Sequence, residues 1–79
     1  MGLAKSEAEL AHRIKSYLKA EVANSEMTYK DFAKELRKHG LRETKASVTN
    51  KLARGTFPAT FLLGALAALE MDGLRLEDV

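Results

Sequence analysis

Three basic side chains, Lys30, Lys34 and Arg37, recur at the spacing of one helical face. Such cations can neutralise phosphates, contacts that position a protein on a nucleic acid without reading its sequence. Residues 30–54 hold eight basic and three acidic side chains, a surplus of five, whereas residues 55–79 hold one basic and four acidic. A positive field on one part of a small chain fits a polyanionic partner. A lysine-rich face that serves only solubility is the competing interpretation.

A second group of side chains has the chemistry to read bases. Ser47, Asn50 and Arg54 share one face of a helix, with Lys51 at its flank, Lys45 before it and small alanines beside it. Asparagine can form two hydrogen bonds with an adenine edge, and serine can bond a base or a phosphate. Small neighbours let a helix backbone approach a groove closely. Exposure of these polar residues for solubility alone is again the other interpretation.

Residues that would support catalysis or metal binding are sparse. The chain has no cysteine, which excludes disulfides, thiolate zinc sites and cysteine nucleophiles. Its two histidines are far apart, since His12 falls on the first predicted helix and His39 directly after the second, and no Ser/His/Asp or paired-carboxylate spacing is present. The five glycines are scattered, so no phosphate-cradling loop is expected. We therefore expect no enzyme activity, no cofactor and no metal.

Four helices joined by short turns are predicted to position these residues. They span residues 6–23, 28–38, 44–54 and 58–70, and residues 74–76 form either a last half-turn or an edge strand. The starts are marked by S-x-x-E, T-x-x-D and a proline suited to a first helical turn, and glycines mark the ends of the second and third helices. The whole chain is expected to fold as one domain.

The expected core comes from apolar stripes on these helices. The helix over 58–70 is apolar almost all round, which predicts a central position. The longest uncharged stretch, Gly55 to Leu69, is too short for the roughly 20 residues of a membrane span, so we expect a cytoplasmic protein with a disordered leader at 1–5. The side chains expected to point inward, rather than to stack on bases, are Leu10, Ile14, Tyr17, Leu18, Tyr29, Phe32, Phe57 and Phe61.

The order of these segments resembles the lambda-repressor-like (Cro/Xre-type) helix-turn-helix family over residues 8–79. The matching motifs are T-Y-K-D-F-A-K-E-L, S-V-T-N-K-L-A-R-G and the R-G-x-x-P break before the apolar helix. The resemblance implies an all-α, compact four- to five-helix domain in which the helix over 44–54 enters the major groove of double-stranded DNA. It also implies a small bacterial or phage transcriptional regulator.

Two features depart from the family's pattern. Ala33, at the position of the family's packing alanine, is followed by glycine only at Gly40, so the turn before the recognition helix is lengthened. Many family members pair an arginine of the first helix with a glutamate of the third. Glu21 with Lys51 or Arg54 resembles that ion pair with the charges exchanged, and we expect Glu21 to bind one of these two cations.

The sequence thus predicts sequence-specific binding to double-stranded DNA. A homodimer is expected because one short helix reads too few base pairs, with Leu74, Leu76 and the apolar helix as contacts. A protein-interaction module that keeps the fold without binding DNA is the alternative, and structured RNA is a third partner class. The residues predicted to contact DNA are Thr28, Lys30, Lys34, Arg37, Lys45, Ser47, Asn50, Lys51 and Arg54.

Overall fold

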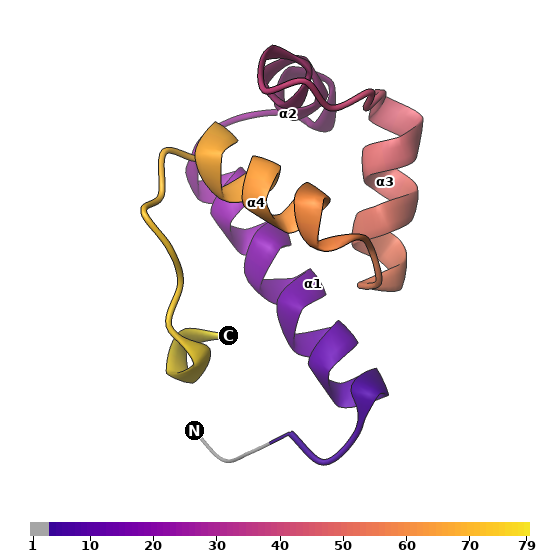
Figure 1. The fold of residues 1–79 in the computed structure, drawn as a ribbon, viewed down its shortest axis with the longest axis vertical. Helices are drawn as coiled ribbons and strands as arrows, with labels where there is room; N and C mark the ends of the chain where they lie inside the picture. Colours follow the sequence, from indigo (N-terminus) through magenta and orange to yellow (C-terminus); the bar gives the residue numbers. More distant parts are fainter. Residues whose placement is uncertain (1–3) are drawn as a thin grey trace.

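Four α-helices make up most of residues 4–79, the part of the chain that the computed structural model describes (Figure 1). They are α1 (Glu7–Asn24), α2 (Tyr29–Lys38), α3 (Lys45–Arg54) and α4 (Ala59–Ala68), followed by the short 3-10 helix η1 (Leu76–Asp78). No strand occurs over residues 4–79, so the predicted all-α class is confirmed. Residues 1–3 of the expected leader lie outside the described residues.

The first two helices begin at the side-chain caps that the sequence predicted. The Ser6 hydroxyl accepts the Glu9 amide of α1 at 3.1 Å. Thr28 and Asp31 form a reciprocal capping box at the start of α2. The start of α3 has a second capping box, between Thr44 and Ser47, which satisfies two backbone donors that the helix leaves unpaired.

The helix ends explain the small differences from the predicted bounds. Gly55 ends α3 with φ of 72°, as its glycine predicted. The helix α4 stops at Ala68, two residues before the predicted end, because Glu70 adopts φ of 58° and the Met71 amide bonds the Leu66 carbonyl at 2.8 Å. Residues 74–76 form no strand, so the edge-strand alternative is wrong, and of these three residues only Leu76 belongs to the short 3-10 helix η1.

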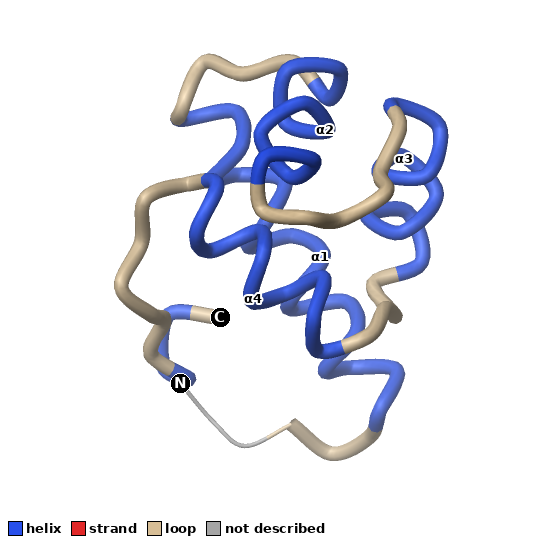
Figure 2. The backbone as a smooth tube through the Cα atoms, turned by 45° about the horizontal axis from the view of Figure 1, so that its top comes forward, coloured by secondary structure: helices blue, strands red, loops and turns tan. Residues whose placement is uncertain are grey.

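One hydrophobic core joins the four helices. The helix α3 packs on α1 and α2, and α4 packs on α2, so α3 is held from two sides (Figures 1 and 2). The Phe57 and Phe61 rings lie 4.8 Å apart and tilted. The buried apolar side chains are Leu18, Val22, Phe32, Ala33, Leu36, Val48, Leu52, Phe61, Ala65 and Ala68.

One expectation about the core is wrong. Leu10, expected to face inward, is 54% exposed because the 18-residue α1 extends past the shorter helices that cover it (Figure 1). The helix α4 buries Phe61, Gly64, Ala65 and Ala68 on one face, whereas its Leu63 is 65% exposed. An apolar surface therefore remains on α4.

Candidate nucleic-acid interface

The outer face of α3 is the surface that the sequence predicted to read bases. Val48 and Leu52 point into the core and fix which side of the helix faces solvent. None of the exposed side chains on this helix is acidic, and two are alanines. The residues that form this face, which we call the α3 outer face, are Lys45, Ala46, Thr49, Asn50, Ala53 and Arg54.

The α3 outer face is rotated by about one residue from the predicted one. Ser47 was expected to face outward, but it turns toward the preceding loop, where its hydroxyl donates to a Glu43 carboxylate oxygen at 2.7 Å. Thr49 takes the outward position, and its hydroxyl bonds the Lys45 carbonyl of the preceding turn at 2.8 Å. Sequence reasoning missed Thr49, although its place four residues after Lys45 and four before Ala53 marks the same face.

Lys51 is held by an ion pair inside the protein. Its ammonium lies 2.6 Å from the Glu43 carboxylate and 5.1 Å from the centre of the Phe61 ring. The expected pairing of Glu21 with Lys51 or Arg54 is therefore wrong. Glu21 instead lies beside Tyr17 and Asp78, in a hollow between α1 and residues 78 and 79. The carboxylate that pairs with Lys51 comes from the loop before α3.

The predicted basic row on α2 lies on its solvent side. Lys30, Lys34 and Arg37 are exposed, opposite the buried Phe32 and its neighbours. The Arg37 guanidinium donates to the Glu43 carbonyl at 2.8 Å, across the loop that leads into α3. This contact connects the end of the basic row to the start of α3, so the two predicted cation groups are structurally adjacent.

Thr28 lies at the start of α2 with its side chain already in use. Its hydroxyl accepts the Asp31 amide at 3.1 Å, and the Asp31 carboxylate accepts the Thr28 amide at 3.3 Å. The carboxylate also places negative charge at the helix end where a phosphate would otherwise be favoured. Thr28 therefore acts as a helix cap in this structure.

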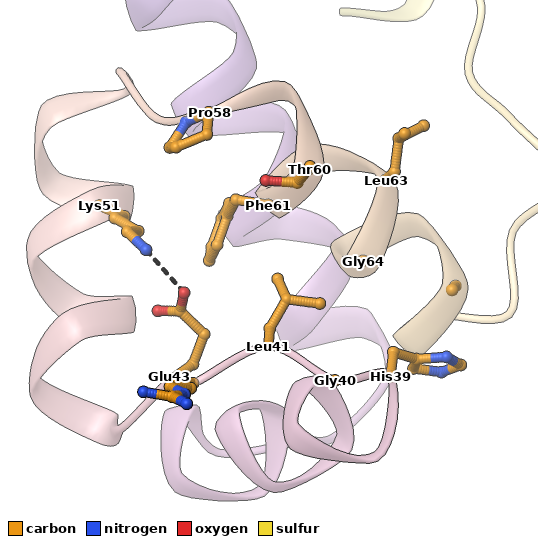
Figure 3. A pocket seen from close by; sticks show the side chains of 12 residues that line it. His39, Gly40, Leu41, Glu43, Lys51, Pro58, Thr60, Phe61, Leu63 and Gly64 are labelled. Carbon is orange, nitrogen blue, oxygen red and sulfur yellow. Dashed lines mark hydrogen bonds and ion pairs between the residues drawn. The ribbon is translucent and has the colours of Figure 1, made fainter.

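A shallow pocket of about 640 Å³ lies between α4 and the loop that joins α2 to α3 (Figure 3). Leu41 points from the loop toward Phe61 and Gly64, and the Glu43–Lys51 pair closes the α3 side (Figure 3). The loop is thus tied to α4 by apolar contacts and to α3 by charge. Residues 39–44 form this connection, the lengthened turn expected from the sequence.

Comparison of the sequence with models of known protein families shows to which family the chain belongs. A family model described as a domain of unknown function, DUF6471, matches residues 10–74, which include most of α1 and all of α2, α3 and α4. The chain belongs to the DUF6471 family. No curated protein and no solved structure matches the sequence.

The acidic side chains in the middle of this DUF6471 domain are all engaged. Asp31 caps α2, Glu35 pairs with Lys38 at 2.9 Å, and Glu43 pairs with Lys51. Most of the excess positive charge of residues 30–54 is therefore not neutralised by ion pairs within the protein. The remaining basic side chains of this segment are exposed and form no ion pair with any of residues 4–79. They are Lys30, Lys34, Arg37, Arg42, Lys45 and Arg54.

Among residues 4–79, two side chains have a pKa shifted from the ordinary value, and both lie on α1. The backbone amide of Lys5 bonds the Glu9 carboxylate and, with the charge of Arg13, lowers its pKa. Desolvation raises the pKa of the Tyr17 phenol, and the nearby charges of Glu21 and Asp78 act in the same direction. Neither group belongs to the basic surface of α2 and α3.

Residues 4–79 contain no group of three or more histidine, cysteine or acidic side chains arranged to hold a metal ion. Over the same residues, no helix combines the length and the apolar character that crossing a bilayer requires.

Proposed function

We propose that this DUF6471 domain binds double-stranded DNA, with the α3 outer face in the major groove, and acts as a small transcriptional regulator. The observation that carries the proposal is the composition of that face. Cations stand at both ends, in Lys45 and Arg54, small side chains lie between them, and acidic groups are absent from it. A surface of this kind suits close approach to a polyanion.

The dimensions of α3 suit a groove. Ten residues rise about 15 Å, and the major groove, about 12 Å wide, admits one helix. Ala46 and Ala53 allow the backbone to approach base edges. Asn50, between them on the α3 outer face, can bond adenine in bidentate fashion, and Arg54 can bond guanine or a phosphate.

The helix α2 would hold the DNA backbone. Lys30 and Lys34 are exposed and free of ion pairs over residues 4–79, so they can neutralise phosphates beside the groove that α3 enters. Arg37, in the last turn of α2, and Arg42, in the loop before α3, extend the same positive surface. The proposal leaves Thr28, Ser47 and Lys51 in structural roles because their polar groups already bond within the protein.

The same proposal includes a cytoplasmic homodimer. A single ten-residue helix contacts few base pairs, and two copies on adjacent half-sites would supply the missing specificity. Leu63 of α4 is exposed, as is Leu76 at 80%. Leu76 borders an apolar groove of about 390 Å³ beside Leu10 and Leu74. Sedimentation equilibrium with and without a DNA duplex measures the association.

A salt-dependent NMR titration tests the DNA proposal. Amide shifts are followed while a mixed-sequence duplex is added to the labelled domain, at about 50 mM and then about 200 mM salt. Binding through phosphates predicts shifts confined to residues 28–38 and 44–54 that fade at the higher salt. A dispersed spectrum without shifts at low salt would refute DNA binding and favour the protein-interaction module. That module would use the apolar surface of α4 and be nearly insensitive to salt.

A further inference from the structure

Glu43 is the buried charged side chain of this fold. It belongs to the loop before α3, yet only 5% of its surface is exposed, and it is the sole polar or charged residue buried over residues 4–79. Burial of a carboxylate is unfavourable unless partners replace its hydration. A position in a loop, where most side chains reach solvent, makes this burial unusual.

Both carboxylate oxygens of Glu43 are bonded by α3. One accepts the Ser47 hydroxyl at 2.7 Å, and the other accepts the Lys51 ammonium at 2.6 Å. Among the described residues, no buried side-chain oxygen or nitrogen is left without a partner, so the carboxylate is fully satisfied. The Lys51 ammonium also lies over the Phe61 ring of α4 at 5.1 Å, as Figure 3 shows from the pocket side.

The two α3 partners are one helical turn apart. Ser47 and Lys51 are four residues apart on the same side of the helix, so bonds from one carboxylate to both fix the helix axis and its rotation about that axis. The backbone of Glu43 is held in turn by Arg37 of α2 at 2.8 Å. Glu43 therefore links α3, through its side chain, to α2, through its backbone.

We infer that Glu43 is a positioning residue that sets the rotation of α3 and thereby the sequence specificity of DNA recognition. This inference rests on the proposed function. A rotation of α3 by one residue would turn Ser47 outward and Thr49 toward the flank, so a different set of side chains would face the bases. Buried ion pairs contribute little net stability compared with well-packed apolar side chains, but they can select one arrangement of a core.

The test replaces both members of the pair by side chains of similar length. The Glu43→Met/Lys51→Met variant removes both charges without leaving either one buried alone, and we expect it to remain folded. Duplexes are selected by the unaltered protein from a pool with a randomised core. The affinities of both proteins for the selected duplex and for a scrambled duplex of the same composition are then compared.

The expected result is a loss of discrimination without a loss of non-specific binding. The ratio of the two affinities should fall by about tenfold, the equivalent of one misread base pair. Affinity for the scrambled duplex and its dependence on salt should stay unchanged, because Lys51 contacts no phosphate. Residual dipolar couplings of the α3 amides, measured without DNA, should shift while those of α1 do not.

A matched control removes an ion pair that does not touch the loop. The Glu35→Met/Lys38→Met variant makes the same substitutions at an exposed pair on α2, 2.9 Å apart, and should keep the full affinity ratio. If the Glu43→Met/Lys51→Met variant does not fold, Glu43→Gln decides the matter, since it keeps the side-chain shape and the Ser47 bond but loses the charge. The same fall in the ratio is expected.

The outcomes separate the two proposals. A protein that selects no duplex overturns the proposed function and this inference with it. A protein that selects a duplex, together with variants that keep the full ratio and unchanged α3 couplings, overturns the role of Glu43 alone. A change of couplings without a change of the ratio also overturns it, because the rotation of α3 would then not govern base reading.

Discussion

The helices α3 and α4 have equal lengths and opposite outer surfaces. Each has ten residues and each leaves one side exposed to solvent. The exposed side of α3 carries amide, hydroxyl, ammonium and guanidinium groups, whereas Ala59–Ala68 contains no charged residue and exposes Leu63. The start of α3 has a reciprocal capping box, and α4 begins after Pro58 without a side-chain cap. The two helices therefore present different chemistry to solvent, polar and basic on α3 and apolar on α4.

The difference shows which surface suits a charged partner and which an apolar one. Polar groups on α3 are hydrated in the free protein and can exchange water for phosphates and base edges. The apolar surface of α4 gains by losing water altogether, which favours a protein surface. Each of the two helices has a glycine where it packs closely against the rest of the fold: Gly55 at the end of α3 and Gly64 within α4.

The largest effect is expected from Gly55→Ala. A Cβ at this position would collide with the backbone carbonyl of Ala11 in α1, and the residue has φ of 72°. The α1 backbone cannot yield, so we expect a loss of about 3 kcal/mol from the free energy of unfolding, measured by urea titration. Gly40→Ala is the matched control, because its φ is 87° in open space, and should cost only about 1 kcal/mol. Equal losses would show that the contact with α1 does not anchor α3.

The Asn50→Ala variant tests whether the α3 outer face, and not the exposed side of α4, reads bases. The loss of a bidentate base contact should weaken binding to the preferred duplex by about 1–3 kcal/mol and leave binding to scrambled DNA unchanged, as measured by fluorescence anisotropy. Thr60→Ala, an exposed polar position on α4, is the control and should change neither affinity. An equal loss from Asn50→Ala on every duplex would contradict base reading by α3.

The helices could be predicted from the sequence because their determinants are local. Capping residues at Ser6, Thr28 and Thr44, the helix-ending Gly55 and the apolar periodicity all act within a few residues along the chain. The exposure of Leu10 was missed because it depends on how far α1 extends past its neighbours, which is a property of the assembled fold.

The details of the candidate site were harder to predict because they depend on the rotation of one helix. Ser47 is polar enough for either side of α3, and only its bond to Glu43 shows that it faces inward. The spacing of Glu43, Ser47 and Lys51, four residues and then four, was the available signal that all three share one side. The expected partner of Lys51, Glu21, was placed by analogy with a family whose connecting turn is shorter.

Gly64→Ala should cost less than Gly55→Ala, although both helices are closely packed. A Cβ at Gly64 would lie 2.8 Å from the Leu41 Cδ1, which is the far end of a flexible side chain. Rotation of Leu41 into the pocket can relieve this contact, so we expect a loss of about 1 kcal/mol in thermal or urea unfolding. A loss as large as that of Gly55→Ala would mean that α4 cannot shift against the loop.

The smallest effect is expected from Lys34→Ala, and its form matters more than its size. Lys34 is exposed on α2, without an ion pair over residues 4–79, and its removal should leave folding unaltered. The loss of one phosphate contact should lower the affinity equally on all duplexes. The plot of log K against the logarithm of the salt concentration should become shallower by about one. Lys38→Ala is the control, because Lys38 pairs with Glu35, and the slope should change less. If the loss from Lys34→Ala depended on sequence, α2 would take part in reading bases, and the division of roles between α2 and α3 would fail.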